Sequence, residues 1–110
     1  MKISLKNKNK KIVLDVDNLN LFGKVIGLMF TRRENAKALL FDFKHDCNFS
    51  IHSLFVFFPF LAIWINGKGE IVEKRIISSW KLSVNPKDKF SKLIEIPINR
   101  RYSNTLKQFS

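Results

Sequence analysis

The segment FSIHSLFVFFPFLAIWI, residues Phe49–Ile65, runs directly into Asn66-Gly67-Lys68-Gly69. It contains no formally charged side chain, and β-branched and aromatic residues fill most of it. Pro59 divides the segment, because proline cannot donate a hydrogen bond to a sheet ladder. We therefore predict two buried strands, Ile51–Phe58 and Phe60–Ile65, or one strand bent at Pro59.

The same segment is too short and too interrupted for a membrane-spanning helix, which needs about 20 apolar residues. Its aromatic residues are spread along its length, whereas a spanning helix gathers them at both interfaces. The Asn-Gly pair that follows favours a tight hairpin turn. We predict that Asn66–Gly69 joins Leu61–Ile65 to Glu70–Ile76 in antiparallel pairing.

Upstream of this segment, alternating apolar residues predict a hairpin of strands 2–6 and 11–16. A short helix is expected from an N-cap at Asp17 or Asn18 to about Leu28, although two glycines weaken it. A polar loop spans 31–37, a strand covers Ala38–Phe43, and a second loop covers 45–48.

Downstream, the pattern predicts a loop over 78–89, a strand over Phe90–Ile96 and a short helix over Asn99–Gln108. Many short strands with turn signals and few helices indicate a mainly β fold, a compact β-barrel or sandwich-like domain with one or two short helices. A length of 110 residues predicts a single domain over 1–110.

The chain is strongly basic, with 20 Lys and Arg, 9 Asp and Glu, and a net charge of +11. Such a surplus favours anionic partners, including nucleic acids. Lysine, asparagine, isoleucine and phenylalanine are all abundant, however, and their A/T-rich codons explain the surplus without a ligand. No recognisable nucleic-acid-binding motif accompanies the charge. The basic clusters are Lys6–Lys11, Arg32–Arg33, Lys87–Lys92 and Arg100–Arg101.

One cysteine, Cys47, excludes an intrachain disulfide and a zinc site of several cysteines. The basic N-terminal residues are not followed by the apolar stretch of a signal peptide. We expect a cytoplasmic protein without a membrane span. No cofactor or metal site is predicted, and no phosphate-binding glycine loop or hydrolase motif is present.

Four segments in this order resemble the Domain of Unknown Function 192 family of small bacterial and archaeal proteins. They are Gly27–Phe30 followed by Arg32, Leu39–Phe43, Ile51–Pro59 leading to the Gly67–Gly69 turn, and Leu93–Pro97. The resemblance implies a compact, mainly β fold with short helices, and no established activity.

The chain also departs from the pattern of this family at several positions. Leu61 and Asn66 stand where the family often has aspartate, and Ile98 and Asn99 replace a small residue and glycine. The closing Gly-Asp segment is absent. The resemblance therefore implies that any chemistry served by the carboxylate at the position of Leu61 is lost.

The candidate ligand-binding residues are Arg32, Arg33, His52 and Glu95. His52 could be a general base or a ligand, because histidine side chains in general exchange protons near neutral pH, and arginine can clamp an anionic group with two hydrogen bonds. The alternative is structural: His52 bonded to a backbone carbonyl, and the arginines solvated or paired with an acid such as Glu95. We therefore predict a non-enzymatic ligand- or partner-binding module. A nucleic-acid-binding protein and a degenerate enzyme using His52 with Arg32 remain alternatives.

Overall fold

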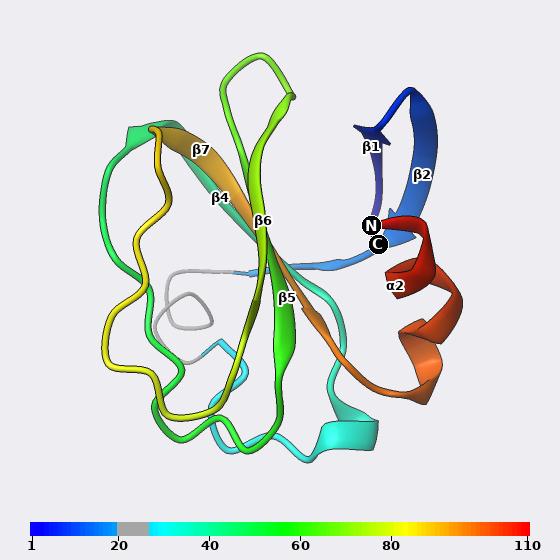
Figure 1. Ribbon diagram of the computed structural model, residues 1–110, viewed down its shortest axis with the longest axis vertical. Coiled ribbons are helices and arrows are strands. Elements are labelled where there is room, and N and C mark those ends of the chain that lie inside the picture. Colours follow the sequence, from blue (N-terminus) through cyan, green and yellow to red (C-terminus); the bar gives the residue numbers. More distant parts are fainter. Residues whose placement is uncertain (20–26) are drawn as a thin grey trace.

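The computed structural model describes residues 1–19 and 27–110 (Figure 1). Strands account for most of its regular structure, and the helices are short. The strands are β1 (Lys2–Asn7), β2 (Lys10–Asp15), β3 (Asp17–Asn18), β4 (Leu39–Cys47), β5 (Phe60–Ile65), β6 (Ile71–Ile77) and β7 (Phe90–Pro97). The helices are η1 (Arg33–Asn35), η2 (Arg100–Tyr102) and α2 (Ser103–Gln108).

A five-stranded sheet with the order β3-β4-β7-β5-β6 forms the centre of the fold. β7 is the middle strand and pairs antiparallel with both β4 and β5, whereas β3 pairs parallel with β4. The β1–β2 hairpin forms a separate two-stranded sheet. The predicted mainly β class is confirmed, and the two sheets are not closed into a barrel.

Each face of the large sheet carries its own hydrophobic core, because side chains alternate between the two faces along each strand. On one face, Leu40, Ile63 and Ile94 pack against the β1–β2 hairpin and the C-terminal segment. Figure 1 shows this hairpin and α2 together on the right of the sheet. On the other face, Phe41 and Leu93 pack against the irregular segments around 48–59 and 78–89.

The turn predicted at Asn66–Gly69 is confirmed. β5 and β6 pair antiparallel across it, from Phe60–Ile77 to Ile65–Ile71. The Asn66 side-chain oxygen accepts hydrogen bonds from the backbone N–H groups of Lys68 and Glu70, each 3.0 Å long. The asparagine therefore stabilises the turn through its own side chain, as such residues commonly do.

The predicted strand Ile51–Phe58 is wrong, because only Ile51 makes a β-bridge, to Val84. Phe55 adopts a left-handed φ of 59°, which breaks an extended chain. The Ser53 carbonyl accepts a hydrogen bond from the Val56 N–H, closing a turn. Buried and exposed residues still follow one another along the segment, and this pattern resembles that of a strand.

Two further boundaries differ from the prediction. β4 continues through the predicted 45–48 loop as far as Cys47, with a register shift against β7 after Asp42. Lys44 has a φ of 60° within that shift, as an irregular ladder allows. Asp17 and Asn18 form β3 rather than a helix N-cap. The body of the predicted helix falls on residues 20–26, outside the described residues.

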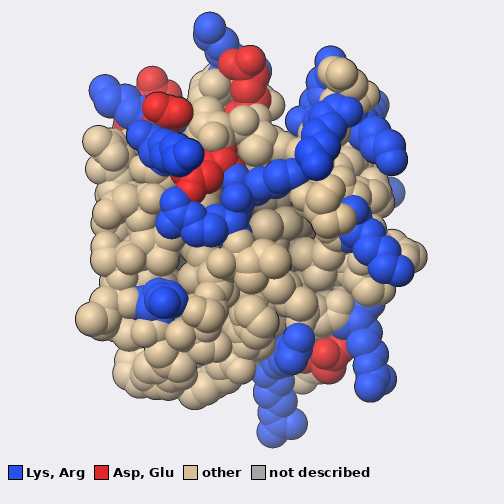
Figure 2. Space-filling view, viewed as in Figure 1, with Lys and Arg blue, Asp and Glu red and all other residues tan. Residues whose placement is uncertain are grey.

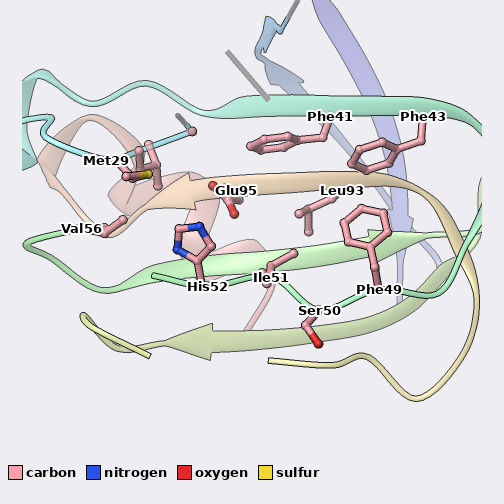
Figure 3. Close-up of a pocket in the computed structure, with 12 residues that line it drawn as sticks. Met29, Phe41, Phe43, Phe49, Ser50, Ile51, His52, Val56, Leu93 and Glu95 are labelled. Atoms are coloured by element: carbon pink, nitrogen blue, oxygen red, sulfur yellow. The ribbon is translucent and has the colours of Figure 1, made fainter. Parts of the chain in front are cut away.

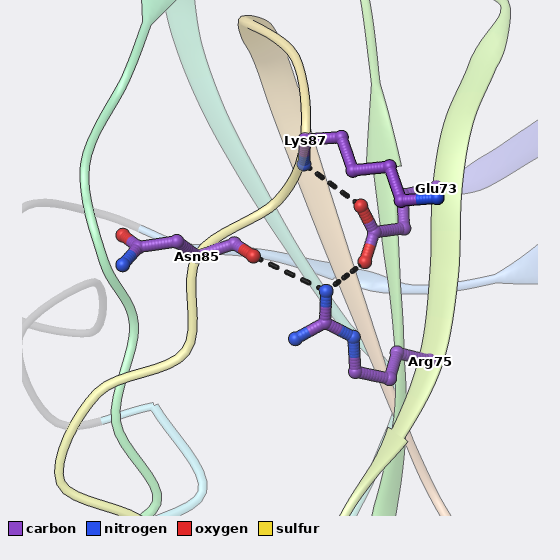
Figure 4. Close-up of polar contacts among 4 residues, drawn as sticks. All are labelled: Glu73, Arg75, Asn85 and Lys87. Carbon is purple, nitrogen blue, oxygen red and sulfur yellow. Dashed lines mark hydrogen bonds and ion pairs between the residues drawn. The ribbon is translucent and has the colours of Figure 1, made fainter.

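The 78–89 loop is fastened to β6 by a small polar cluster (Figure 4). The Glu73 carboxylate accepts a hydrogen bond from the Lys87 backbone N–H at 2.8 Å and pairs with the Arg75 guanidinium. The same guanidinium donates to the Asn85 carbonyl at 3.2 Å. These contacts hold the loop over the sheet face that carries the candidate site.

None of the helices within 1–19 and 27–110 has the length and apolar character needed to cross a bilayer.

Candidate functional site

A pocket of about 140 Å³ opens on the sheet face that lies away from the β1–β2 hairpin (Figure 3). Strands β4 and β7 form one side, and the segment around 49–56 forms the other. Twelve residues line it: Gly27, Leu28, Met29, Phe41, Phe43, Phe49, Ser50, Ile51, His52, Val56, Leu93 and Glu95.

Glu95 is the buried acid of this pocket. It lies in the central strand β7, opposite Leu39 of β4 and Ala62 of β5, and is only 6% exposed. None of the hydrogen bonds among the described residues involves its carboxyl group. Burial raises the pKa of Glu95 to about 8, because an apolar environment disfavours the charged form. At neutral pH the carboxyl is therefore mainly protonated, and it can both donate and accept a hydrogen bond.

His52 faces this acid from the irregular segment. Figure 3 shows the imidazole ring and the Glu95 carboxyl both pointing into the space between that segment and β7. The residue is exposed, and its Nδ1 accepts a hydrogen bond from the Leu54 N–H at 3.2 Å. Because Nδ1 is an acceptor, the neutral ring carries its proton on Nε2. His52 thus offers a fixed donor at the edge of the pocket.

Gly27 lies beside the acid in a backbone conformation that favours glycine. Its φ of +55° is a conformation that a residue with a β-carbon adopts only with strain. A β-carbon at this position would lie 3.6 Å from Glu95 Oε1 and 3.5 Å from Phe41 Cζ. Both are ordinary van der Waals distances, so the backbone conformation, and not a lack of space, favours glycine here.

The chemistry of the lining residues restricts what the pocket can hold. None of these twelve described residues is Lys or Arg, so an anion would meet no lysine or arginine among them. Most of the wall is apolar or aromatic. An apolar cavity of about 150 Å³ holds a benzene molecule, so the volume suits a ligand of about that size. Such a ligand would meet one buried carboxyl group and one imidazole.

The two predicted arginines do not line this pocket. Arg32 is exposed at the residue before η1. Arg33 donates from Nε to the Ile98 carbonyl at 2.7 Å, which ties η1 to the residues after β7. The structure therefore brings His52 and Glu95 together and places Arg32 and Arg33 outside their pocket. Leu61, where the resembling family often has aspartate, packs into the core on the hairpin side of the sheet.

The basic clusters project from several sides of the molecule, as Figure 2 shows for one face. Lys6, Lys8 and Lys68 border a groove between the two hairpin turns, but Glu70 and Glu73 line it as well. Lys74 in the same groove has structural partners, since its Nζ donates to Asn7 Oδ1 and to the Phe109 carbonyl. Burial and the nearby Lys8 lower the pKa of Lys74. The groove is thus mixed in charge.

Sequence reasoning missed the aromatic and sulfur-containing wall formed by Met29, Phe41, Phe43 and Phe49. A signal for it was present in the four segments that carry the family resemblance. Each of these segments contributes to the pocket, and together they supply all of its lining residues except Phe49 and Ser50.

No family model matches the chain, and no curated protein matches it significantly. Two solved structures share its fold. A protein of Sinorhizobium meliloti 1021, named "putative transcription regulator", superposes with a TM-score of 0.74 at 17% identity, over 96% of this chain and 81% of that one. A protein of unknown function from Novosphingobium aromaticivorans DSM 12444 gives 0.73 at 10% identity, over 94% and 76%. At these identities the likeness shows the fold alone.

Proposed function

We propose that this protein is a non-enzymatic module that binds a small, largely apolar ligand with one hydrogen-bonding head group. The observation that carries the proposal is the buried Glu95 carboxyl, which faces an open pocket without a hydrogen bond from any described residue. Buried polar groups are nearly always paired, so a buried carboxyl at the wall of a largely apolar pocket is a suitable partner for the polar group of a ligand.

Two features favour binding over catalysis. The described lining residues include only two ionisable side chains, His52 and Glu95, and His52 Nδ1 is engaged by the Leu54 N–H. The described residues also contain no cluster of three or more acidic, histidine or cysteine side chains that could hold a metal. A degenerate enzyme using His52 with Arg32 would need Arg32 at the pocket, which it does not line.

We also propose that the chain is a divergent member of the Domain of Unknown Function 192 family. The support is spatial: the four resembling segments, far apart in the sequence, all reach the same pocket. A pattern preserved for a shared site would have this arrangement. Leu61, the position of the lost carboxylate, does not line this pocket and packs on the other face of the sheet.

The binding proposal can be tested with benzamide and toluene as probes, using two-dimensional NMR of the full chain. Benzamide has an amide head that can pair with a protonated carboxyl, whereas toluene has none. We expect benzamide to bind several-fold more tightly at pH 6, because one hydrogen bond contributes about 1 kcal/mol. Its affinity should fall above pH 8, where Glu95 ionises.

The Glu95→Gln variant should still bind benzamide but lose the pH dependence, because its amide is neutral at every pH. Glu70→Gln is the matched control, since Glu70 is exposed in the β5–β6 turn. Equal binding of the two probes, or shifts that avoid the pocket residues, would refute the proposal.

A further inference from the structure

Four exposed aromatic side chains form a connected cluster outside the pocket. We call Phe30, Phe55, Phe57 and Trp80 the aromatic patch; each is between 41% and 64% exposed. The Phe30 and Phe55 rings stack with centroids 5.1 Å apart. Trp80 lies edge-on to Phe55 at 5.0 Å and to Phe57 at 5.7 Å. Exposed apolar clusters of this kind mark interaction sites on soluble proteins.

The backbone holds these rings outward in an unfavourable conformation. Phe30, Phe55 and Trp80 have left-handed φ angles of 62°, 59° and 63°, which bulky residues rarely adopt. Backbone hydrogen bonds fix each one. Phe30 N–H donates to the Phe55 carbonyl, and Trp80 N–H donates to the Ser53 carbonyl, both at 2.9 Å. Strain that the surrounding structure maintains is concentrated at functional surfaces.

The segments that build the patch carry basic side chains and no acidic ones. Among the described residues of the three segments that build it, 27–32, 49–59 and 78–84, the formally charged side chains are Arg32 and Lys81. Both are exposed. In Figure 2 the lower left of the molecule, where these segments lie in Figure 1, is an almost uncharged surface. The partner should therefore combine an apolar layer with negative charge.

We propose that the aromatic patch inserts into the interface of an anionic lipid bilayer, with Arg32 and Lys81 contacting the head groups. Tryptophan and phenylalanine favour this interfacial layer, and basic side chains beside it are attracted by anionic lipids. The net charge of +11 adds a longer-range attraction.

A single-stranded nucleic acid fits the patch less well. Base stacking needs open ring faces beside a basic track. Here the rings cover one another in part, and the neighbouring Leu82, 79% exposed, has no face for stacking. Of the lysines that the structure describes, only Lys81 lies in these segments.

Co-sedimentation of the full chain with lipid vesicles tests the proposal. Vesicles of phosphatidylcholine with one-fifth phosphatidylserine should bind the protein about tenfold more tightly than pure phosphatidylcholine. Phe57→Ser should weaken this binding about tenfold. The matched control is Ile76→Ser, which removes a side chain of similar exposure, 63% against 60%, from outside the patch and should change binding less than twofold.

Tryptophan emission gives a second readout. The blue shift on vesicle binding should come from Trp80 and vanish in Trp80→Phe, because Trp64 is already buried. The proposal would be overturned by no binding to either vesicle, by equal losses in Phe57→Ser and Ile76→Ser, or by patch-dependent binding to oligothymidylate in place of vesicles. Self-association of the protein that Phe57→Ser abolishes, without vesicle binding, would assign the patch to a second copy and would also overturn it.

Discussion

The Glu95 side chain couples folding to pH at the scale of a single residue. The pKa of its carboxyl rises from 4.5 to about 8 on burial, so the native protein binds an extra proton relative to the unfolded chain between these two values. The free energy of unfolding therefore decreases as pH rises through this window and levels off above it. The stabilisation is fully present below about pH 4.5 and lost by about pH 8.

We expect Glu95→Gln to remove most of this dependence, because glutamine stays neutral. In urea unfolding at pH 5, 6, 7 and 8, the wild type should lose up to about 1.4 kcal/mol per pH unit relative to the variant. The variant should be the more stable protein at pH 8. Glu70→Gln, on the exposed turn, should keep the wild-type slope. Parallel pH profiles for wild type and Glu95→Gln would mean that Glu95 is ionised and solvated in the native state.

At the scale of elements, Ser53 joins the two irregular segments that cover the site. Its hydroxyl donates to the Ser78 carbonyl and accepts from the Lys81 N–H, both at 2.7 Å, and the residue is completely buried. Its backbone N–H and carbonyl bond to Lys81 and Trp80 as well. The hydrogen bonds of this one residue thus join two segments that a regular strand pair would join through a ladder of backbone bonds.

We expect Ser53→Ala to cost about 2 kcal/mol of unfolding free energy, because it leaves the part-buried Lys81 N–H and Ser78 carbonyl without that partner. Denaturant unfolding measures the loss. Ser83→Ala, at an exposed position in the same loop, should change stability by less than about 0.5 kcal/mol. A loss in Ser53→Ala no greater than in Ser83→Ala would show that the two segments do not depend on this hydroxyl.

The same segments show which parts of the fold could be predicted from the sequence and which could not. The hairpin over 2–6 and 11–16 and the turn at Asn66–Gly69 were predictable, because alternation and turn residues are local signals. The strand over Ile51–Phe58 was predicted wrongly. Its apolar residues are buried by the sheet face and by the 78–84 segment, and not through pairing in a ladder. Apolar residues that are buried by distant parts of the chain can show the same alternation in the sequence as the residues of a β-strand.

For the candidate site, too, individual residues could be predicted from the sequence, but their arrangement in space could not. His52 and Glu95 were identified because a polar residue in an apolar run is visible in the sequence. Their shared pocket, and the place of Phe41 and Phe49 in its wall, depend on segments that only the fold brings together. The grouping of Arg32 with His52 rested on the linear resemblance, and the pocket does not include that arginine.

At the scale of the whole molecule, the net charge of +11 produces repulsion between basic side chains at low salt. Its extents are 32 × 30 × 23 Å, and the Debye length is about 30 Å at 0.01 M ionic strength but about 8 Å at 0.15 M. At low salt every cation therefore repels most others, and like charges even face each other across a ladder at Lys6 and Lys11. Salt should relieve this repulsion.

We expect Tm to rise by roughly 5 °C between 0.01 and 0.15 M NaCl, which corresponds to about 1 kcal/mol for a chain of this size. Thermal unfolding followed by circular dichroism measures the shift. Lys11→Glu, which places opposite charges across the β1–β2 ladder, should reduce it. A Tm that stays constant or falls over this range would show that favourable ion pairs outweigh the repulsion.

The central position of β7 also has a consequence for how the chain is made. β4 and β5 each pair with β7 and not with each other. On the ribosome, both strands are therefore synthesised before β7, the strand that joins them. Until Phe90–Pro97 is synthesised, the apolar strand Phe60–Ile65 can pair only with β6 and has no sheet to complete. Nascent chains of this protein should therefore be substrates for chaperones that recognise extended apolar segments, until the last strand arrives.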